Sequence, residues 1–137
     1  EFDFVKAIHV LVPQIEHALR GIADELGLPV TKASPVAPEV SVGINMGDML
    51  YARPELTAAL GEDLTLHFRA LYADPRGFNL RNYLAHGMME AQEMTFGAAT
   101  RVMHSLLILG AWKEISESRN RPAQNQGEEL PGTANGE

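Results

Sequence analysis

The sequence predicts an all-α fold: a bundle of four to five helices with a proline-rich connection after the first helix and a flexible C-terminal tail. Apolar residues recur at alternating steps of four and three in several segments, which places them on one helix face. Clusters of glycine and proline separate these segments. The length of 137 residues suits one compact domain. We therefore expect one helical domain over residues 1–118 and a disordered tail over residues 119–137.

The first helix is expected over residues 4–26. Its apolar stripe consists of Phe4, Ile8, Leu11, Ile15, Leu19, Ile22 and Leu26. Pro13 removes one backbone donor inside this helix, so it should bend the helix or mark a new start. Gly27 is a natural end for the helix, because glycine readily adopts the left-handed conformation of a helix C-terminus.

Residues 29–47 form the proline-rich connection, with prolines at positions 29, 35 and 38. Val40, Val42 and Ile44 alternate with smaller or polar residues, which favours a short extended segment laid against the helices. Asn45 or Asp48 could then cap a short helical turn. The connection therefore leads back into helical structure.

Two helices are expected next, over residues 54–60, where Pro54 suits a first turn, and over residues 62–72, which open on two carboxylates. The run Asp74-Pro75-Arg76-Gly77 is typical of a turn, and Asn79 is a suitable N-cap for a helix over residues 80–88.

A long core helix is expected over residues 91–115, on the stripe Phe96, Ala99, Met103, Leu106 and Gly110. From Ser116 onward the chain has too little apolar surface to offset the entropy of ordering it.

Composition excludes several classes of protein. Cysteine is absent, which excludes disulfides, thiol catalysis and cysteine-ligated metals and fits a reducing compartment, so we expect a cytoplasmic protein. No segment has the roughly 18–20 uninterrupted apolar residues of a membrane helix, and we expect no membrane partner. The net charge of −7 argues against broad binding of nucleic acid. Because the chain opens without methionine, we expect it to be a piece of a longer parent protein.

Three polar residues of the helix expected over residues 80–88 could act together. Asn82 and His86 are four residues apart on one helix face, and Arg81 flanks that face. Histidine exchanges a proton near neutral pH, arginine holds a phosphate by its planar fork, and asparagine can orient either one. These side chains suit metal-free cleavage of a phosphodiester, so we expect no metal and no cofactor.

These residues carry a resemblance to a known family. The spacing of Arg81 and His86 resembles the Arg-x4-6-His signature of HEPN domains. The run Asp74 to Gly87 resembles the RNxxxHG hallmark of the domain of unknown function 4209, and Leu11 to Arg20 resembles that family's first helix. The resemblance covers roughly residues 4–110.

The resemblance implies a HEPN-like helical bundle that forms a homodimer, with the motif helices of two subunits around one cleft. It also implies a metal-independent endoribonuclease in which Arg81, Asn82 and His86 are catalytic. His86 would exchange protons at the ribose 2′-hydroxyl or the leaving oxygen, and Arg81 would stabilise charge on the phosphate. RNA and a second copy of the chain are therefore the expected partners. Arg76 and Arg101 are candidates for additional phosphate contacts.

Other interpretations remain open at this point. His86 and Gly87 could simply end a helix, and Arg81 with Asn82 could form a structural network with Glu16 or with the Asp74 turn. The domain would then be a non-catalytic dimerisation or interaction module of a larger protein. A third hypothesis is a regulatory domain that binds a nucleotide phosphate through Arg81 without turnover. The methionines around the motif could fill the core or form a dimer surface.

Overall fold

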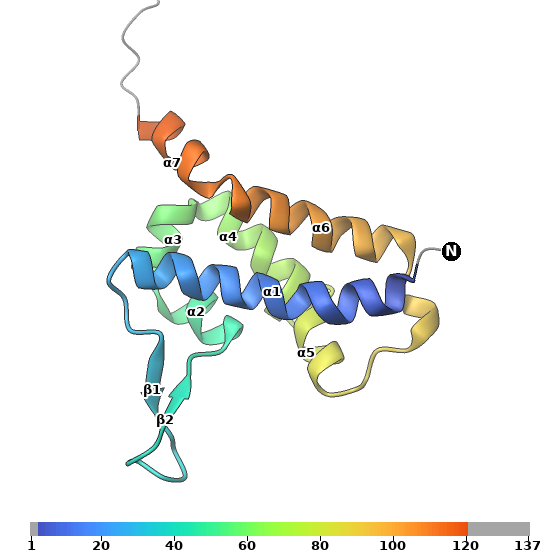
Figure 1. Cartoon of the computed structure of the whole chain (residues 1–137), viewed down its shortest axis with the longest axis horizontal. Helices are drawn as coiled ribbons and strands as arrows, with labels where there is room; N and C mark the ends of the chain where they lie inside the picture. Colours follow the sequence, from blue (N-terminus) through green and yellow to red (C-terminus); the bar gives the residue numbers. More distant parts are fainter. Residues whose placement is uncertain (1–2, 121–137) are drawn as a thin grey trace, which may run out of the picture.

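The computed structural model describes residues 3–120, and within them the chain is all-α apart from one small hairpin. The prediction of an all-α bundle is confirmed. The described residues form more helices than the four to five expected, because several of the helices are short. Figure 1 labels the elements, which are α1 (Phe4–Glu25), β1 (Thr31–Ala33), β2 (Ser41–Gly43), α2 (Met46–Ala52), α3 (Pro54–Leu60), α4 (Glu62–Phe68), α5 (Leu80–Ala85), α6 (Phe96–Gly110) and α7 (Trp112–Asn120). No helix in this part of the chain is long and apolar enough to cross a membrane.

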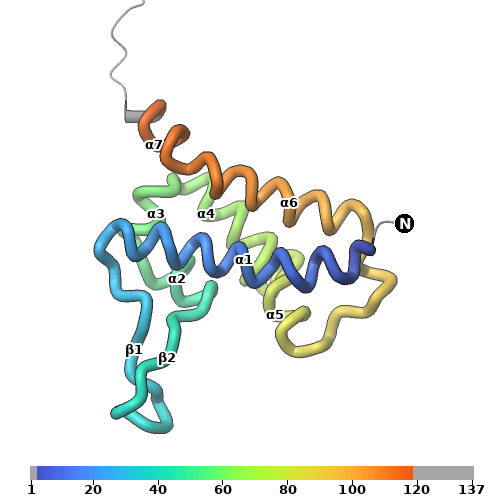
Figure 2. The backbone as a smooth tube through the Cα atoms, viewed as in Figure 1, coloured from blue at the N-terminus to red at the C-terminus, as the bar shows by residue number. Residues whose placement is uncertain are grey.

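Helix α1 runs as one uninterrupted helix through Pro13. It begins at Asp3, whose side chain accepts a hydrogen bond from the Lys6 amide at 3.0 Å, and Gly27 follows its end with φ of 72°. The predicted stripe is buried at Ile8, Ile15, Leu19 and Ile22. Val12, which was not assigned to the stripe, is buried with them, whereas Leu11 is half-buried and Leu26 is exposed. Figure 2 shows α1 and α6 side by side and running in the same direction. Their first residues meet, with the Phe4 and Phe96 ring centroids 5.7 Å apart.

The proline-rich connection forms a hairpin instead of a segment laid against the helices. β1 pairs with β2 in antiparallel register, with Lys32 opposite Val42. Both strands are largely exposed, and Figure 1 shows the hairpin projecting from the bundle. At its base the Arg20 guanidinium donates to the Ile44 carbonyl oxygen at 3.0 Å. Lys32 of β1 also forms an ion pair with Asp48 of α2, so the hairpin is anchored to both α1 and α2.

The short helices α2, α3 and α4 begin where local sequence signals predict. The Asn45 side chain accepts from the Asp48 amide at 2.8 Å and caps α2. Pro54 is the first residue of α3, and Gly61, with φ of 90°, separates α3 from α4. Helix α4 continues into a π-helical turn over Arg69–Ala73, so the helix predicted over residues 62–72 is present with a wider last turn.

The turn after this π-helical segment depends on Gly77. The Phe78 amide donates to the Ala70 carbonyl oxygen at 2.8 Å, which brings the turn against the preceding helix. A Cβ atom built on Gly77 would lie only 2.1 Å from that same oxygen. No side chain larger than hydrogen fits there without a shift of the backbone. This close approach sets the position at which α5 begins.

The C-terminal region differs from the single helix predicted over residues 91–115. A 3₁₀ turn at Ala91–Glu93 precedes α6, and the Thr95 side chain caps α6 by accepting from the Ala98 amide at 3.3 Å. Ala111 interrupts the helix before α7. Helix α7 extends to Asn120, so residues 116–118 belong to a helix and not to the tail expected from Ser116 onward. The rest of the predicted tail, 121–137, lies outside the described residues.

The core is formed where α1, α4, the π-helical turn and α6 meet. Its largest fully buried side chains are Phe68 and Tyr72, whose rings stack with centroids 6.1 Å apart. The Tyr72 hydroxyl donates to Ser105 Oγ at 2.8 Å, and Ser105 donates to the Arg101 carbonyl oxygen at 2.9 Å. Burial raises the pKa of Tyr72 well above its usual value. This buried polar pair joins α6 to the centre of the domain.

Candidate functional site

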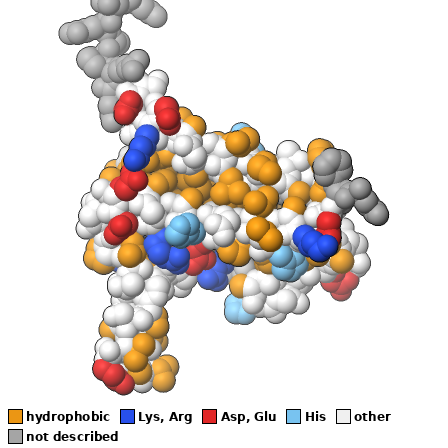
Figure 3. Space-filling view, in the orientation of Figure 1, with side chains coloured by type: hydrophobic (Ala, Val, Ile, Leu, Met, Phe, Trp, Pro, Cys, Tyr) orange, Lys and Arg blue, Asp and Glu red, His pale blue; other side chains and the backbone are white. Residues whose placement is uncertain are grey.

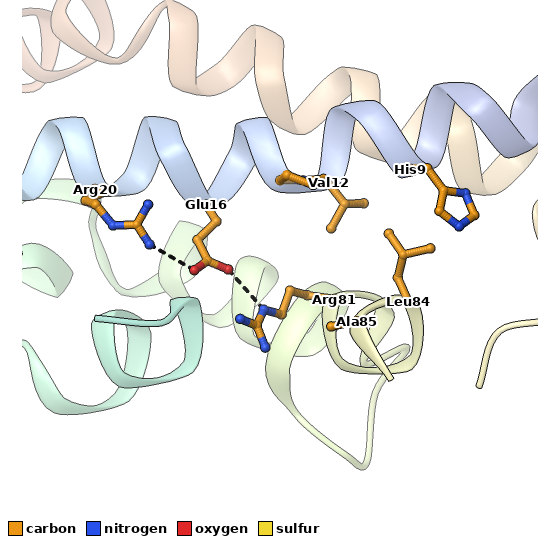
Figure 4. A pocket seen from close by; sticks show the side chains of 8 residues that line it. His9, Val12, Glu16, Arg20, Arg81, Leu84 and Ala85 are labelled. Atoms are coloured by element: carbon orange, nitrogen blue, oxygen red, sulfur yellow. Dashed lines mark hydrogen bonds and ion pairs between the residues drawn. The ribbon is translucent and has the colours of Figure 1, made fainter. Parts of the chain in front are cut away.

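A carboxylate held between two arginines lies at the junction of α1 and α5. Glu16 Oε1 accepts from Arg20 Nη2 at 2.9 Å, and Glu16 Oε2 accepts from Arg81 Nε at 3.0 Å. Figure 4 shows the three side chains in contact. The Glu16 side chain is only 16% exposed, and those of Arg20 and Arg81 are 30% and 27% exposed. Partial burial reduces screening by water, so these ion pairs are stronger than surface pairs.

Helical spacing and one long-range contact assemble this cluster. Glu16 and Arg20 are four residues apart on α1, the spacing at which side chains on a helix become neighbours. Arg81 is the second residue of α5 and reaches across from the other helix. The structural network that sequence reasoning left open for Arg81 is therefore present, with Glu16 as its partner.

Asn82 continues the network away from Glu16. Its side-chain oxygen accepts from Arg81 Nη1 at 3.3 Å, and its side-chain nitrogen donates to Asn79 Oδ1 at 2.7 Å. Asn79 lies at the N-cap position of α5 as predicted, in the left-handed conformation with φ of 48°. Its side chain makes no hydrogen bond to a backbone amide of α5, so it orients Asn82 instead of capping the helix.

His86 lies apart from this network. Helix α5 ends at Ala85, so His86 is the C-terminal cap, and its amide donates to the Asn82 carbonyl oxygen at 3.0 Å. Gly87 follows with φ of 64°, which is the left-handed helix end that the sequence allowed. The His86 side chain is exposed and makes no hydrogen bond within residues 3–120. The structure thus joins Arg81 to Asn82 but does not bring the His86 imidazole into their cluster.

A pocket of about 430 Å³ opens between α1 and α5. Its lining residues are His9, Val12, Pro13, Glu16, Arg20, Arg81, Leu84 and Ala85. Figure 4 shows the charged cluster at one end, and His9 with Leu84 at the other. His86 and Asn82 are not among the lining residues. The sequence identified Arg81 and left Glu16 open as its structural partner, but nothing in it pointed to His9, which carries no motif.

The two further arginines proposed for phosphate contacts lie outside this pocket. Arg76 forms a two-point ion pair with Asp74 in the turn, at 3.0 Å and 2.8 Å. The Arg76 hydrogen bonds hold the pKa of the Asp74 carboxyl well below its usual value. Arg101 lies over the Phe78 ring, 5.0 Å from its centroid. The structure therefore does not gather Arg76, Arg101 and Arg81 around one point.

A second concave surface runs along the line where α1 and α6 meet, and we call it the α1–α6 groove. It has a volume of about 450 Å³ and is lined by Phe4, Ala7, Leu11, Phe96, Ala99, Thr100, Met103, His104 and Leu107. Figure 3 shows hydrophobic side chains gathered along this line. Phe96, Met103 and Leu107 are 68%, 48% and 65% exposed. The sequence stripe that predicted a core helix at residues 91–115 therefore includes residues that face out of the domain.

No cluster of three or more histidine and acidic side chains suited to a metal ion occurs among residues 3–120. Comparisons of the chain with family models, with curated proteins and with solved structures give no match. The resemblance to HEPN domains remains a prediction from the motif residues.

Proposed function

We propose that this chain is a non-catalytic helical interaction module, which pairs with a second copy of itself through the α1–α6 groove. The observation that carries the proposal is the row of exposed apolar side chains on α6, at Phe96, Met103 and Leu107. Monomeric proteins seldom expose a continuous apolar surface of this kind, and such surfaces mark sites of association. Among residues 3–120, His104 is the one ionisable side chain that lines the groove.

The groove suits self-association because one surface supplies both complementary shapes. The Phe96 and Leu107 side chains protrude from α6, and the trough between α6 and α1 can receive side chains of similar size. A two-fold axis would place these residues of each copy against the trough of the other. The pairing would bring two α1–α6 pairs together as a four-helix layer.

The motif geometry supports a structural role for Arg81 and Asn82. The Arg81 Nε–H is already committed to Glu16, and the Asn82 side chain bonds both Arg81 and Asn79. Catalysis on a phosphodiester would require Arg81 and His86 to converge on one phosphate. In a single chain, Arg81 lines the α1–α5 pocket and His86 does not. In the proposed structural role, Arg81 holds α5 against α1 through its bond to Glu16.

A charge placed in the groove tests the pairing. Leu107→Glu should convert a dimer to a monomer, because an uncompensated buried carboxylate costs about 2 kcal/mol or more, over tenfold in affinity. Leu66→Glu is the matched control, because Leu66 is 64% exposed on α4 and outside the groove, against 65% for Leu107. Sedimentation equilibrium would measure the oligomeric state of the native chain and of both variants. A native chain that stays monomeric at all accessible concentrations, or an equal effect of both variants, would contradict the proposal.

A second candidate function is metal-independent cleavage of RNA. The observation that favours it is the exposed His86 imidazole, which makes no hydrogen bond within residues 3–120, on the same short segment as Arg81. In this mechanism His86 takes the proton of the ribose 2′-hydroxyl and the 2′-oxygen attacks the phosphorus to form a 2′,3′-cyclic phosphate. The bond from phosphorus to the 5′-oxygen breaks, and the 5′-oxygen takes a proton from water. Arg81 would have to break its hydrogen bond to Glu16 in order to bind the phosphate.

Incubation with single-stranded RNA in the presence of a chelator separates the two functions. We expect no cleavage by the native chain, since His86 and Arg81 do not share a pocket. Cleavage that is lost in both Arg81→Ala and His86→Ala, while circular dichroism stays native, would establish the ribonuclease instead. His67→Ala serves as the control, because His67 lies on α4 and outside the α1–α5 pocket.

A further inference from the structure

The α1–α5 pocket combines a charged end with an apolar end. Glu16, Arg20 and Arg81 form the charged end, while Val12, Leu84 and Ala85 supply the apolar surface (Figure 4). Binding pockets for small molecules have volumes of about 300–1,000 Å³ and place a few polar groups within a mainly apolar lining. At about 430 Å³ this pocket falls within that range.

The charged end carries one positive charge that Glu16 does not balance. Each Glu16 oxygen accepts from one arginine, so two guanidinium groups share a single carboxylate. Arg20 Nη1 and Arg81 Nη2 have no hydrogen-bond partner within residues 3–120. Arg20 Nε is buried and also lacks an acceptor. The cluster can therefore accept one further anion.

We infer that this pocket binds a small organic acid, with its carboxylate on the arginines and its apolar body along α1. A planar carboxylate fits the fork of a guanidinium group, and its single charge balances the cluster. A phosphate dianion would bring a second negative charge close to Glu16, which is only 16% exposed. Val12, Leu84 and Ala85 suit an apolar body.

The pocket also limits the length of the ligand. His9 lies seven residues before Glu16 on α1, which corresponds to about 10 Å along the helix axis. His9 Nδ1 lies 2.8 Å from the Val5 carbonyl oxygen and donates to it, which holds the ring at this end of the pocket. An acid with a body the size of a phenylpropyl group spans this distance.

The inference is independent of the proposed dimer. The α1–α5 pocket and the α1–α6 groove share no lining residue, and Figure 1 shows α5 and α6 on different sides of α1. Loss of dimerisation in Leu107→Glu should therefore leave the pocket and its ligand affinity unchanged.

Amide NMR spectra of the native chain, titrated with phenylpropanoate, test the inference. We expect shifts of amides in α1 around Glu16 and in α5 at millimolar concentrations of the acid. Phenylpropanol has the same apolar body without the charge and should bind at least tenfold more weakly. Equal binding of the alcohol, or the absence of shifts with the acid, would overturn the inference. Tighter binding of inorganic phosphate or adenosine monophosphate at the same amides would replace it with a phosphate site.

Two variants act on opposite ends of the pocket. Arg20→Gln should weaken phenylpropanoate about tenfold by removing the excess charge, and Ala85→Leu should weaken it by filling the apolar end. Ala85 is exposed at the end of α5, so its replacement leaves the fold intact. Arg53→Gln is the control, because Arg53 lies outside the pocket and donates to the Pro29 carbonyl oxygen. This variant should bind phenylpropanoate with the affinity of the native chain. Native affinity in Arg20→Gln and Ala85→Leu would place the ligand elsewhere.

Discussion

Gly77→Ala is expected to lower the free energy of unfolding by about 3 kcal/mol, because the new methyl group would meet the Ala70 carbonyl oxygen at 2.1 Å. The hydrogen bond from the Phe78 amide to that oxygen must lengthen or break to relieve the overlap. Urea unfolding followed by circular dichroism measures the change. Because this turn positions α5, amide shifts should also report a displacement of Arg81 from Glu16.

Gly21→Ala is the matched control for this substitution. Gly21 lies inside α1, and a Cβ atom built on it meets nothing within 4 Å. Alanine there should raise the free energy of unfolding by about 0.5–1 kcal/mol, since alanine has less backbone freedom to lose in a helix. If Gly77→Ala were as well tolerated as Gly21→Ala, the close approach of the turn to Ala70 would be refuted.

Ile15→Ala should cost about 2–5 kcal/mol, which is comparable to the effect at Gly77 or larger. Ile15 is completely buried on the inner face of α1, so the deletion leaves a cavity in addition to the lost transfer free energy. Val10→Ala on the same helix is the comparison, because Val10 is 60% exposed, and it should change stability by less than about 0.5 kcal/mol. Similar losses in the two variants would show that α1 does not bury the predicted face.

The helices that sequence patterns predicted well are those set by local physical rules. The stripe of α1 repeats over six turns, and its inner residues are buried as expected. Asn45 and Pro54 act through their own backbone neighbourhood, so their roles at the starts of α2 and α3 could be predicted from a few residues. Gly27 ends α1 for the same local reason.

Features that depend on contacts distant in sequence were harder to predict. The stripe of α6 was interpreted as core, but α1 covers only one side of α6 and leaves Phe96 and Met103 of that stripe exposed. The strand at Ser41–Gly43 was expected, yet its partner at Thr31–Ala33 carries no alternation of apolar and polar burial. The extension of α7 beyond Ser116 adds mainly polar residues, which composition alone assigns to a tail.

The candidate site also combines features that local sequence predicts with features that depend on contacts distant in sequence. Sequence reasoning identified Arg81, Asn82 and His86 from their spacing and left Glu16 open as a structural partner. The pairing of Glu16 with Arg81 joins positions 65 residues apart, and no local pattern could choose it over a phosphate. Helix α5 ends at Ala85, three residues earlier than the helix predicted to Met88, and His86 is its C-terminal cap outside the cluster of Arg81 and Glu16.

The common direction of α1 and α6 has an electrostatic consequence. Each helix carries a partial positive charge of about half a unit at its first turn, and the contact of Phe4 with Phe96 holds these two ends together. Asp3 compensates α1 with a full negative charge, whereas Thr95 offers α6 only a neutral hydroxyl. The single carboxylate of Asp3 therefore offsets the partial positive charges at both helix starts, and apolar packing holds the rest of the seam. Added salt screens this compensation, as it screens the Glu16 ion pairs.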